Sequence, residues 1–571
     1  MAELCARLDG IPLAIELAAA RAKSLTAHQI LKGLEDSLRL LTGGSRLVMP
    51  RQQTLEASIA WSHDLLAETE RVLLRRLSVF AGGWDLEAAE AICADESLDA
   101  MAVLDGLERL IDQSLVRVEE NGATARYQLL ETVRQFADRV LTDPVERASI
   151  VGAHTAWYQR LAMEVGPLVE GPDDLDAIAR LIPDRDNISA ALRRLQVAAT
   201  ADDFAQTVLA LCPFWYRVDK ELDAGATWMT SALLRLGDEP GIAGAKLLTA
   251  RAWTHLGLGR IGPLITDFSA ALALCEQVDD RRTLGRIRTL GGFLNGNMDL
   301  SVGVAMLDQA YLDCEAADDP FGAANARGYT AFLYLSIGDH IQAETALREV
   351  ERLLGQHGNA GLFALHRSLQ AVLCVAAGDH TGAAALFTPD GRAENPMFEA
   401  GRMRFELLCA ADFGEPVPSV DRLFERLRHF ERTNDERTAG MVRRTIVRTR
   451  WFNDELDEAL AFADVAIAGA FGGDLLLAGS LFESAQIAVA LGDFEGARER
   501  FARAGDIASI QLQTTVEART TAALLARHDG DLARAEDEVN RALSIAVEQT
   551  YIREILRALE MLAGLAAAHG S

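Results

Sequence analysis

Aromatic side chains that are able to line a ligand site gather in one part of the sequence. Trp215, Tyr216, Trp228 and Trp253 occur there with Phe214, although aromatic residues make up only 6% of the chain. Aromatic rings are common in ligand pockets because they offer flat apolar surface with a polar edge. These residues also stand at helical spacing among alanines, which is the usual arrangement of a packed helical core. The sequence therefore leaves two interpretations open, a ligand pocket and core packing.

A second candidate site lies close to the N-terminus, in the stretch LDGIPLAIELAAARAKSL that covers residues 8–25. Gly10 and Pro12 lead directly into an alanine-rich amphipathic helix. Proline is ordinary in the first turn of a helix, where its missing N–H is not needed. A helix that begins this rigidly is nevertheless typical of a segment held against a ligand or another domain.

The best-defined catalytic and metal-binding motifs do not occur in this sequence. It contains no G-x-x-x-x-G-K-[ST] phosphate loop, no H-E-x-x-H and no G-x-S-x-G. The glycines of GGFLNGNMD, which starts at residue 291, lack the Lys and Ser/Thr that a phosphate loop needs. His357 and His366 have no carboxylates at ligand spacing. We therefore expect neither a metal site nor enzymatic activity in this chain.

Composition and charge exclude further classes of protein. A chain of 571 residues is too long for one hydrophobic core, and 49% apolar with 25% charged residues indicates globular domains. The formal charge of −28 arises from 84 acidic and 56 basic residues. Nonspecific nucleic-acid binding depends on Lys and Arg that neutralise phosphates, so the chain as a whole is unsuited to it.

Three features predict a cytoplasmic protein that makes no membrane contact. The longest apolar runs are much shorter than the roughly 20 residues needed to cross a bilayer. Glu3 and Asp9 stand where a signal peptide would carry basic and then apolar residues. The seven cysteines are odd in number and include no C-x-x-C pair, which favours reduced thiols.

The order of the local patterns divides the chain into three segments, residues 1–46, 50–145 and 150–571. The first is typical of two or more helices that end at TGGS. In the second, apolar periodicity predicts helices over 54–66, 68–80, 85–93 and 100–113, with Asp85 as an N-cap. Two short alternating runs, 114–119 and 125–130, flank an Asn121-Gly122 turn and predict a β-hairpin. Helices followed by such a hairpin describe a winged helix.

The third segment contains a helical repeat with a period near 39 residues. Each copy has an apolar helix end, a Gly-Asp turn and a small residue four positions after the Asp, as in LSIGDHIQAETAL and VALGDFEGARERF. The glycine suits a left-handed helix end, the Asp suits an N-cap, and the small residue lets two helices approach. The marker aspartates are Asp339, Asp379, Asp493 and Asp531, with weaker copies at Asp299 and Asp454. We therefore predict a mainly all-α fold, a small winged helix followed by a TPR-like α-solenoid.

Several of these stretches resemble bacterial STAND regulators, the NB-ARC-like ATPases of large LuxR-type and AfsR-type transcription regulators. The resemblance is carried by LDGIPLAIELAAARA, by RQQTLEASIAWSHDLLAETERVLLRRLSVFAGGWDLEAAEAIC, and by VLDGLERLIDQSLV with RYQLLETVRQFA. DNISAALRRL and FWYRVDKELDAGATWMTSAL are similar to the start of the helical-repeat sensor in the same proteins. The likeness is specific over residues 1 to about 235 and generic after that.

The resemblance implies a role for each segment. Residues 1–46 would be the remnant of the helical NB-ARC subdomain, in which Gly10 and Pro12 would contact bound ADP or ATP. The family places its P-loop core upstream of the position of Met1, so the chain looks like a truncated or split member. We therefore expect no cofactor in this chain, with a separate P-loop domain as a possible partner.

Two departures from the family bear on function. Related proteins often carry Met-His-Asp at the end of the wing, whereas Leu129-Leu130-Glu131 stands here, and a leucine cannot donate a hydrogen bond to phosphate. The third helix of the winged helix shows Asp99, Asp105, Glu108 and Asp112 against Arg109 alone. Because DNA-reading helices present Arg, Lys, Asn or Gln, we expect no direct DNA binding from this chain.

Two hypotheses from different classes follow. In the first, the chain is the sensor part of a STAND-type regulator, whose repeats bind a small-molecule inducer or a protein partner and whose winged helix relays that binding. In the second, it is a helical-repeat scaffold for protein partners without nucleotide switching. A neighbouring gene for a P-loop domain would favour the first hypothesis.

Overall fold

The computed structural model describes residues 59–569, with gaps at 61, 122–123, 219–220, 239, 297–298, 337–338, 377–378, 380–381, 383–384, 387–418, 433–435, 469–472, 506–511 and 549–551. The described chain forms two compact units. The first runs up to Gly166 and includes Ile178–Thr200, and the second consists of Pro167–Ala177 and the residues from Ala201 onward. Gly10, Pro12 and the whole segment 1–46 lie outside the described residues.

The first unit contains the predicted helix-rich domain and its hairpin. Its helices are α6 (Glu68–Leu77), α7 (Leu86–Cys93), α8 (Ala100–Asp112), α9 (Glu131–Val140), α10 (Pro144–Val165) and α12 (Arg185–Ala198). The carboxylate of Asp85 accepts a hydrogen bond from Ala88 N, which confirms Asp85 as the N-cap of α7. The helix expected over 68–80 begins at Glu68 as predicted and ends three residues early, at Leu77.

The hairpin of the winged helix consists of β1 (Val116–Asn121) and β2 (Thr124–Leu129), paired antiparallel. Asn121 pairs with Thr124, so Asn121 is the last residue of β1 and is not part of the turn that was predicted at Asn121-Gly122. A bridge between Trp84 and Tyr127 adds a short third partner beside β2. The strand order and the preceding helices confirm the predicted winged helix.

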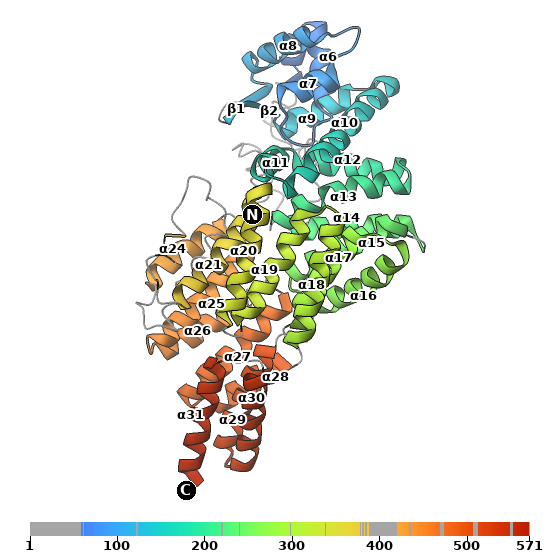
Figure 1. Ribbon diagram of the computed structural model, residues 1–571. Helices are drawn as coiled ribbons and strands as arrows, with labels where there is room; N and C mark the ends of the chain where they lie inside the picture. The colour runs from blue at the N-terminus through green and yellow to red at the C-terminus, as the bar shows by residue number, and fades with distance from the viewer. Residues whose placement is uncertain are drawn as a thin grey trace, which may run out of the picture. The chain divides into compact units, whose positions relative to one another are not determined.

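The second unit is an array of antiparallel helix pairs, which confirms the predicted helical solenoid (Figure 1). Before the long gap the helices are α13 (Ala201–Arg217), α14 (Leu222–Leu236), α15 (Gly241–Gly257), α16 (Ile261–Val278), α17 (Arg281–Gly296), α18 (Leu300–Ala316), α19 (Pro320–Ser336), α20 (His340–His357) and α21 (Ala360–Ala376). After it come α24 (Val420–Arg432), α25 (Glu436–Phe452), α26 (Leu456–Ala468), α27 (Gly473–Leu491), α28 (Phe494–Gly505), α29 (Leu512–His528), α30 (Leu532–Glu548) and α31 (Ile552–His569).

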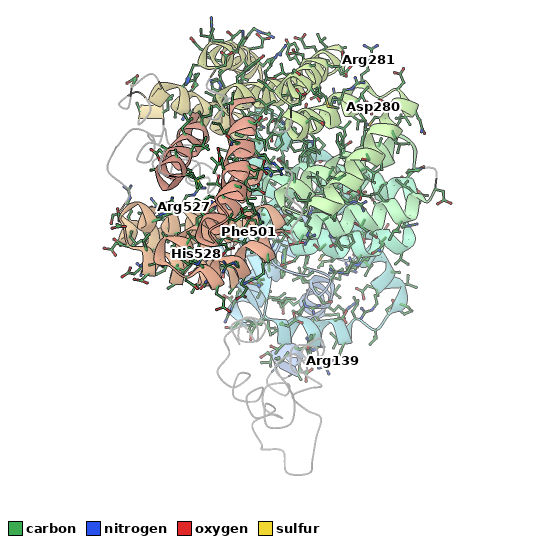
Figure 2. The ribbon with its side chains drawn as sticks, turned by 90° about the horizontal axis from the view of Figure 1, so that it is seen from below. Arg139, Asp280, Arg281, Phe501, Arg527 and His528 are labelled. Carbon is green, nitrogen blue, oxygen red and sulfur yellow. The ribbon has the colours of Figure 1, made fainter. Side chains whose placement is uncertain are left out.

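Most of the marker residues of the repeat act as the pattern predicts. Asp299 and Asp339 accept hydrogen bonds from backbone amides in the first turns of α18 and α20. Gly492 and Gly530, just before the markers in the last copies, have φ of 81° and 78°. The small residues Ala343, Ala497 and Ala535 are fully buried. The same capping occurs at the start of α17, where Asp280, labelled in Figure 2, accepts hydrogen bonds from Thr283 N and Oγ1.

The prediction that Asp454 is a marker aspartate of the repeat was wrong by one position. Asp454 has a φ of 64°, so it occupies the left-handed position that glycine takes in the other copies. Asp and Asn tolerate this conformation better than other residues with a Cβ. The residue that matches the marker aspartate of the other copies is therefore Glu455, and α26 begins directly after it at Leu456.

The odd-numbered helices of this array form one layer. Each of α13, α15, α17, α19 and α21 contacts the next helix of this series directly, whereas contacts between successive even-numbered helices are sparser. In a curved solenoid the more closely packed layer faces inward, and its surface is the one that such proteins use for binding. We call this layer the inner layer.

Candidate ligand-binding face of the helical repeats

A line of aromatic rings crosses the inner layer. The rings of Tyr216 on α13 and Trp253 on α15 have centroids 6.2 Å apart, and Tyr329 on α19 lies 5.5 Å from Trp253. Phe293 on α17 continues the line, 5.0 Å from Tyr329 and 5.8 Å from Phe332. We call these five residues, from four successive helices of the inner layer, the aromatic line.

The repeat itself brings these rings together. Tyr216, Trp253, Phe293 and Tyr329 follow one another at intervals of 37, 40 and 36 residues, close to the repeat period. Residues one period apart occupy equivalent positions on neighbouring inner helices, so their side chains meet although they are distant in sequence. Phe293, Tyr329 and Phe332 were not among the predicted site residues, because they lie outside the aromatic cluster of residues 214–253. The repeat period relates them to Trp253 and is the signal that predicts them.

The aromatic line is only half covered. Tyr216 is 36% exposed, and Trp253, Phe293 and Tyr329 are each partly exposed. Trp253 also packs against the buried apolar cluster around Leu264 and Leu290, which holds its ring in place. A row of fixed, partly exposed rings suits flat apolar groups by stacking and cationic groups by cation–π attraction.

Ion pairs on the opposite side of α15 fix the orientation of Trp253. Arg251 makes two hydrogen bonds of 2.7 Å to the carboxylate of Asp267 on α16. His255, one turn after Arg251, lies 3.5 Å from the same carboxylate. Burial lowers the pKa of His255, and the nearby Asp267 opposes this shift. Trp253 stands between Arg251 and His255 in sequence, so it lies on the other side of the helix.

The structure separates the four aromatic residues singled out in the sequence. Tyr216 and Trp253 belong to the aromatic line. Trp215 is 4% exposed and lies against Gly225 of α14, where an added Cβ would be 2.7 Å from Trp215 Cβ. Trp228 makes an edge contact with Phe204, at 6.4 Å between ring centroids, outside the line. Trp215 is therefore part of the core, whereas Tyr216 and Trp253 are at least partly exposed on the inner layer, and the ligand pocket stays a prediction.

Leu129, Leu130 and Glu131 form the end of the wing and the start of α9. Leu129 is buried at the end of β2, and Leu130 is the residue that precedes α9. The carboxylate of Glu131 accepts two hydrogen bonds from Arg134, at 2.7 and 2.8 Å, and one from Gln135. The Glu131 carboxylate is therefore engaged within the first turns of α9, and the N-cap Leu130 makes no side-chain hydrogen bond to the helix.

The helices and hairpin of the first unit correspond to a known domain. Residues 66–142 match the winged helix-turn-helix domain family. This match covers α6 to α9 with the hairpin between α8 and α9, and the first unit is named accordingly below.

The chain also resembles bacterial regulators over about half of its length. It is 39% identical over 303 residues to a protein of Mycobacterium tuberculosis whose name describes it as a candidate HTH-type transcriptional regulator. The matched region is 52% of this chain and 34% of that protein. The chain thus spans about a third of the length of the curated relatives that it matches first.

Two solved structures align with large parts of the chain at low similarity. A Rap protein in complex with competence and sporulation factor aligns with 64% of this chain and 99% of its own, at 11% identity and a TM-score of 0.36. A STAND protein with a tetratricopeptide repeat sensor from Pyrococcus horikoshii aligns with 96% of this chain and 73% of its own, at 13% identity and a TM-score of 0.33. TM-scores this low carry no argument about function.

The winged helix-turn-helix domain presents an acidic surface on its third helix. The exposed residues of α8 after its first turn are Asp105, Glu108, Arg109 and Asp112. Three carboxylates against one guanidinium repel the phosphates of a duplex. The buried side of the same helix, with Val103, Leu107 and Leu110, packs into the domain core.

The described residues include neither a cluster of metal ligands nor a membrane-spanning helix. No group of three or more His, Cys, Asp or Glu is arranged there to hold a metal ion. No helix among these residues is long and apolar enough to cross a bilayer.

Proposed function

We propose that this chain is the sensor part of a STAND-type signal-transducing transcription regulator. In this proposal the helical repeats bind a small-molecule inducer or a protein partner, and the winged helix-turn-helix domain relays the binding to a nucleotide-binding module. The match of residues 66–142 and the similarity to an HTH-type regulator support a role in regulation. The observation that carries the sensor role is the aromatic line, because it is a fixed, half-exposed binding surface on the inner layer.

The relay follows from a two-state argument. A ligand changes an equilibrium only by as much as it binds one state better than the other. A ligand that contacts Tyr216, Trp253 and Tyr329 joins three different helices, so it favours one curvature of the repeats over others. We propose that the winged helix-turn-helix domain and the nucleotide-binding module respond to this change in curvature.

We propose further that the chain acts in the cytoplasm, binds no DNA directly and does not hydrolyse ATP. The acidic exposed side of α8 supports the second point. The lack of a G-x-x-x-x-G-K-[ST] motif in the sequence supports the third, since phosphate binding in such ATPases needs that loop and its lysine. Titration calorimetry with ADP and ATP tests whether nucleotide binds at all. Micromolar binding that Pro12→Ala weakens would show that residues near Gly10 and Pro12 still hold nucleotide.

A ligand screen with matched variants tests the sensor role. Thermal melting of the native chain is measured against a library of aromatic and cationic small molecules and short peptides. A true ligand of the aromatic line raises the melting temperature of the native chain and of Trp228→Ala, but not of Trp253→Ala. Trp228 is the control because it is also a partly exposed tryptophan of the repeats outside the line. Equal stabilisation of both variants by every hit would contradict the proposed site.

A further inference from the structure

The segment Pro167–Ala177 belongs to the repeat unit although the chain on both sides of it belongs to the first unit. We call this segment the strap. It begins within a short 3₁₀ helix, Gly166–Glu170, and ends in the first turn of α11 (Asp174–Leu181). It is not part of any helix pair of the repeats, yet it contacts inner-layer helices as distant in sequence as α21.

Two arginines of the repeats bind two carboxylates of the strap. Glu170 accepts hydrogen bonds from both terminal nitrogens of Arg286 on α17, at 2.8 and 2.7 Å. Asp174 accepts one from Arg217, the last residue of α13, at 2.9 Å and another from Gly361 N on α21 at 3.2 Å. Leu175 N also donates to Asp174, at 3.0 Å. Asp174 is 1% exposed, so its charge is held almost out of water, where hydrogen bonds and an ion pair are needed to stabilise it.

A buried asparagine binds the backbone of the strap between these two carboxylates. The side-chain amide of Asn359, just before α21, donates to the carbonyl oxygens of Val169 and Gly171, both at 3.1 Å. Val169 is fully buried, and Asn359 is 1% exposed. The part of the strap that the repeats contact therefore has a defined pattern: a buried aliphatic residue (Val169), then Glu170, then Asp174 four positions later. Backbone hydrogen bonds with pockets for alternate side chains are the chemistry of peptide recognition.

Two of the repeat residues that bind the strap, Arg286 and Asn359, are also held in place by contacts that do not involve the strap. Arg286 is also bound by Asp319, at 2.7 and 3.0 Å, which keeps its guanidinium in position on its other side. The side-chain oxygen of Asn359 accepts from Leu362 N, so the same residue is the N-cap of α21. Removal of the strap would leave these donors oriented, and preorganised donors are what a peptide site needs.

We propose that Arg217, Arg286 and Asn359 form a binding site for acidic peptides, which the strap occupies as a built-in ligand. A partner segment with the same pattern of an aliphatic residue, Glu and Asp competes for the site and displaces the strap. The proposal does not rest on the aromatic line, since none of its residues belongs to that line.

The competition has a defined direction. A tethered segment has an effective concentration on the order of millimolar or higher, so a free peptide of equal intrinsic affinity binds the native chain weakly. Weakening the strap raises the fraction of open site and hence the apparent affinity for free peptide. If the strap occupies the site for roughly 90–99% of the time, opening it strengthens peptide binding about 10–100-fold.

The test uses a fluorescein-labelled peptide of residues 166–177 and the full chain, with binding read as fluorescence anisotropy. The strap variant is Glu170→Gln with Asp174→Asn. Its charge-matched control is Asp173→Asn with Asp176→Asn, since both of these residues are exposed in the same segment. We expect the strap variant to bind the peptide at least about tenfold more tightly than the native chain. The control variant should behave like the native chain, and a peptide with Gln and Asn at the Glu170 and Asp174 positions should not bind.

Hydrogen exchange of the strap amides reports whether the strap is released from the site in the strap variant. In the strap variant these amides should exchange faster than in the native chain and in the control. If they exchange faster and the peptide still does not bind, the site does not recognise acidic peptides and the proposal is wrong. If they do not exchange faster, the two ion pairs do not hold the strap, and the proposal is equally wrong.

Discussion

Arg126 and Asp184 join the hairpin of the winged helix-turn-helix domain to the residue that precedes α12. Arg126 Nη2 lies 2.9 Å from Asp184 Oδ1 and also donates to the carbonyl oxygens of Gly83 and Pro183, at 2.8 and 2.9 Å. Asn187 completes the junction, since its amide donates to Gly83 O and its oxygen accepts from Ala81 N. The domain thus continues beyond the hairpin, into a helix that lies more than fifty residues further along the chain.

Replacement of Arg126 should loosen this junction. Arg126→Ala removes the cation from the largely buried carboxylate of Asp184 and leaves Pro183 O without this donor, while Gly83 O keeps its hydrogen bond from Asn187. We expect a loss of about 3–5 kcal/mol of stability. The measurement is hydrogen-exchange protection of amides in β2 and α12. Arg117→Ala is the control, because Arg117 lies exposed on the neighbouring strand. Comparable loss of protection in both variants would show that the junction contributes nothing specific.

His154 should make the first unit sensitive to acid. Arg194 donates to His154 Nδ1 at 2.9 Å, so the proton resides on Nε2, which lies 3.3 Å from Asn187 Oδ1. Burial, followed by the charge of Arg194, lowers the pKa of His154 to about 3. Below about pH 6.5, the usual pKa of histidine, His154 becomes protonated in the unfolded state but stays neutral in the folded state. Protonation therefore stabilises the unfolded state, and the stability of the fold decreases as pH falls.

This residue should account for a loss of about 2 kcal/mol between pH 7 and pH 5. Denaturant unfolding of the first unit is measured at both pH values, for the native chain and for His154→Leu. The variant should lose less stability on acidification, whatever its stability at pH 7. His340→Gln, at an exposed site in the repeats, should keep the native pH dependence. An unchanged pH dependence in His154→Leu would refute the assignment.

Two glycine substitutions should have opposite effects on the repeats. A Cβ added at Gly303 of α18 would lie 2.2 Å from Gly296 Cα of α17, so Gly303→Ala must force these helices apart. We expect a loss of about 1–3 kcal/mol, or more if the backbones cannot shift. At Gly355, in α20, no atom lies within 4 Å of an added Cβ, so Gly355→Ala should gain about 0.5–1 kcal/mol. Calorimetric melting of the two variants checks both signs.

The acidic side of α8 should prevent DNA binding by the winged helix-turn-helix domain. Anisotropy of a labelled random duplex should show no binding of the native chain at micromolar concentration in low salt. Replacing Asp105, Glu108 and Asp112 together by Lys should produce salt-dependent, sequence-independent binding, because the new cations neutralise phosphates. Native binding that tightens on one particular sequence would instead show that α8 reads DNA.

Local sequence determined the elements of this protein and their repetition. The N-caps Asp85, Asp299 and Asp339 were predictable because a carboxylate caps the helix that starts next to it, through contacts within three residues. The hairpin was also predictable from local sequence, because two short alternating runs flank a turn, although Asn121 belongs to β1 and not to that turn. The register of Asp454 was not, because an Asp is also tolerated in the left-handed position that precedes a cap.

Only the tertiary structure decided which side chains meet. Trp215 and Tyr216 are adjacent in sequence, yet one is buried against Gly225 and the other joins a line of rings from three further helices. No local pattern indicated that Glu170 binds Arg286, or that Asn359 binds the backbone of residues 169 and 171, because such contacts span more than a hundred positions. The physical reason is that periodicity fixes the face of a helix, whereas the stacking of successive repeats fixes what that face meets.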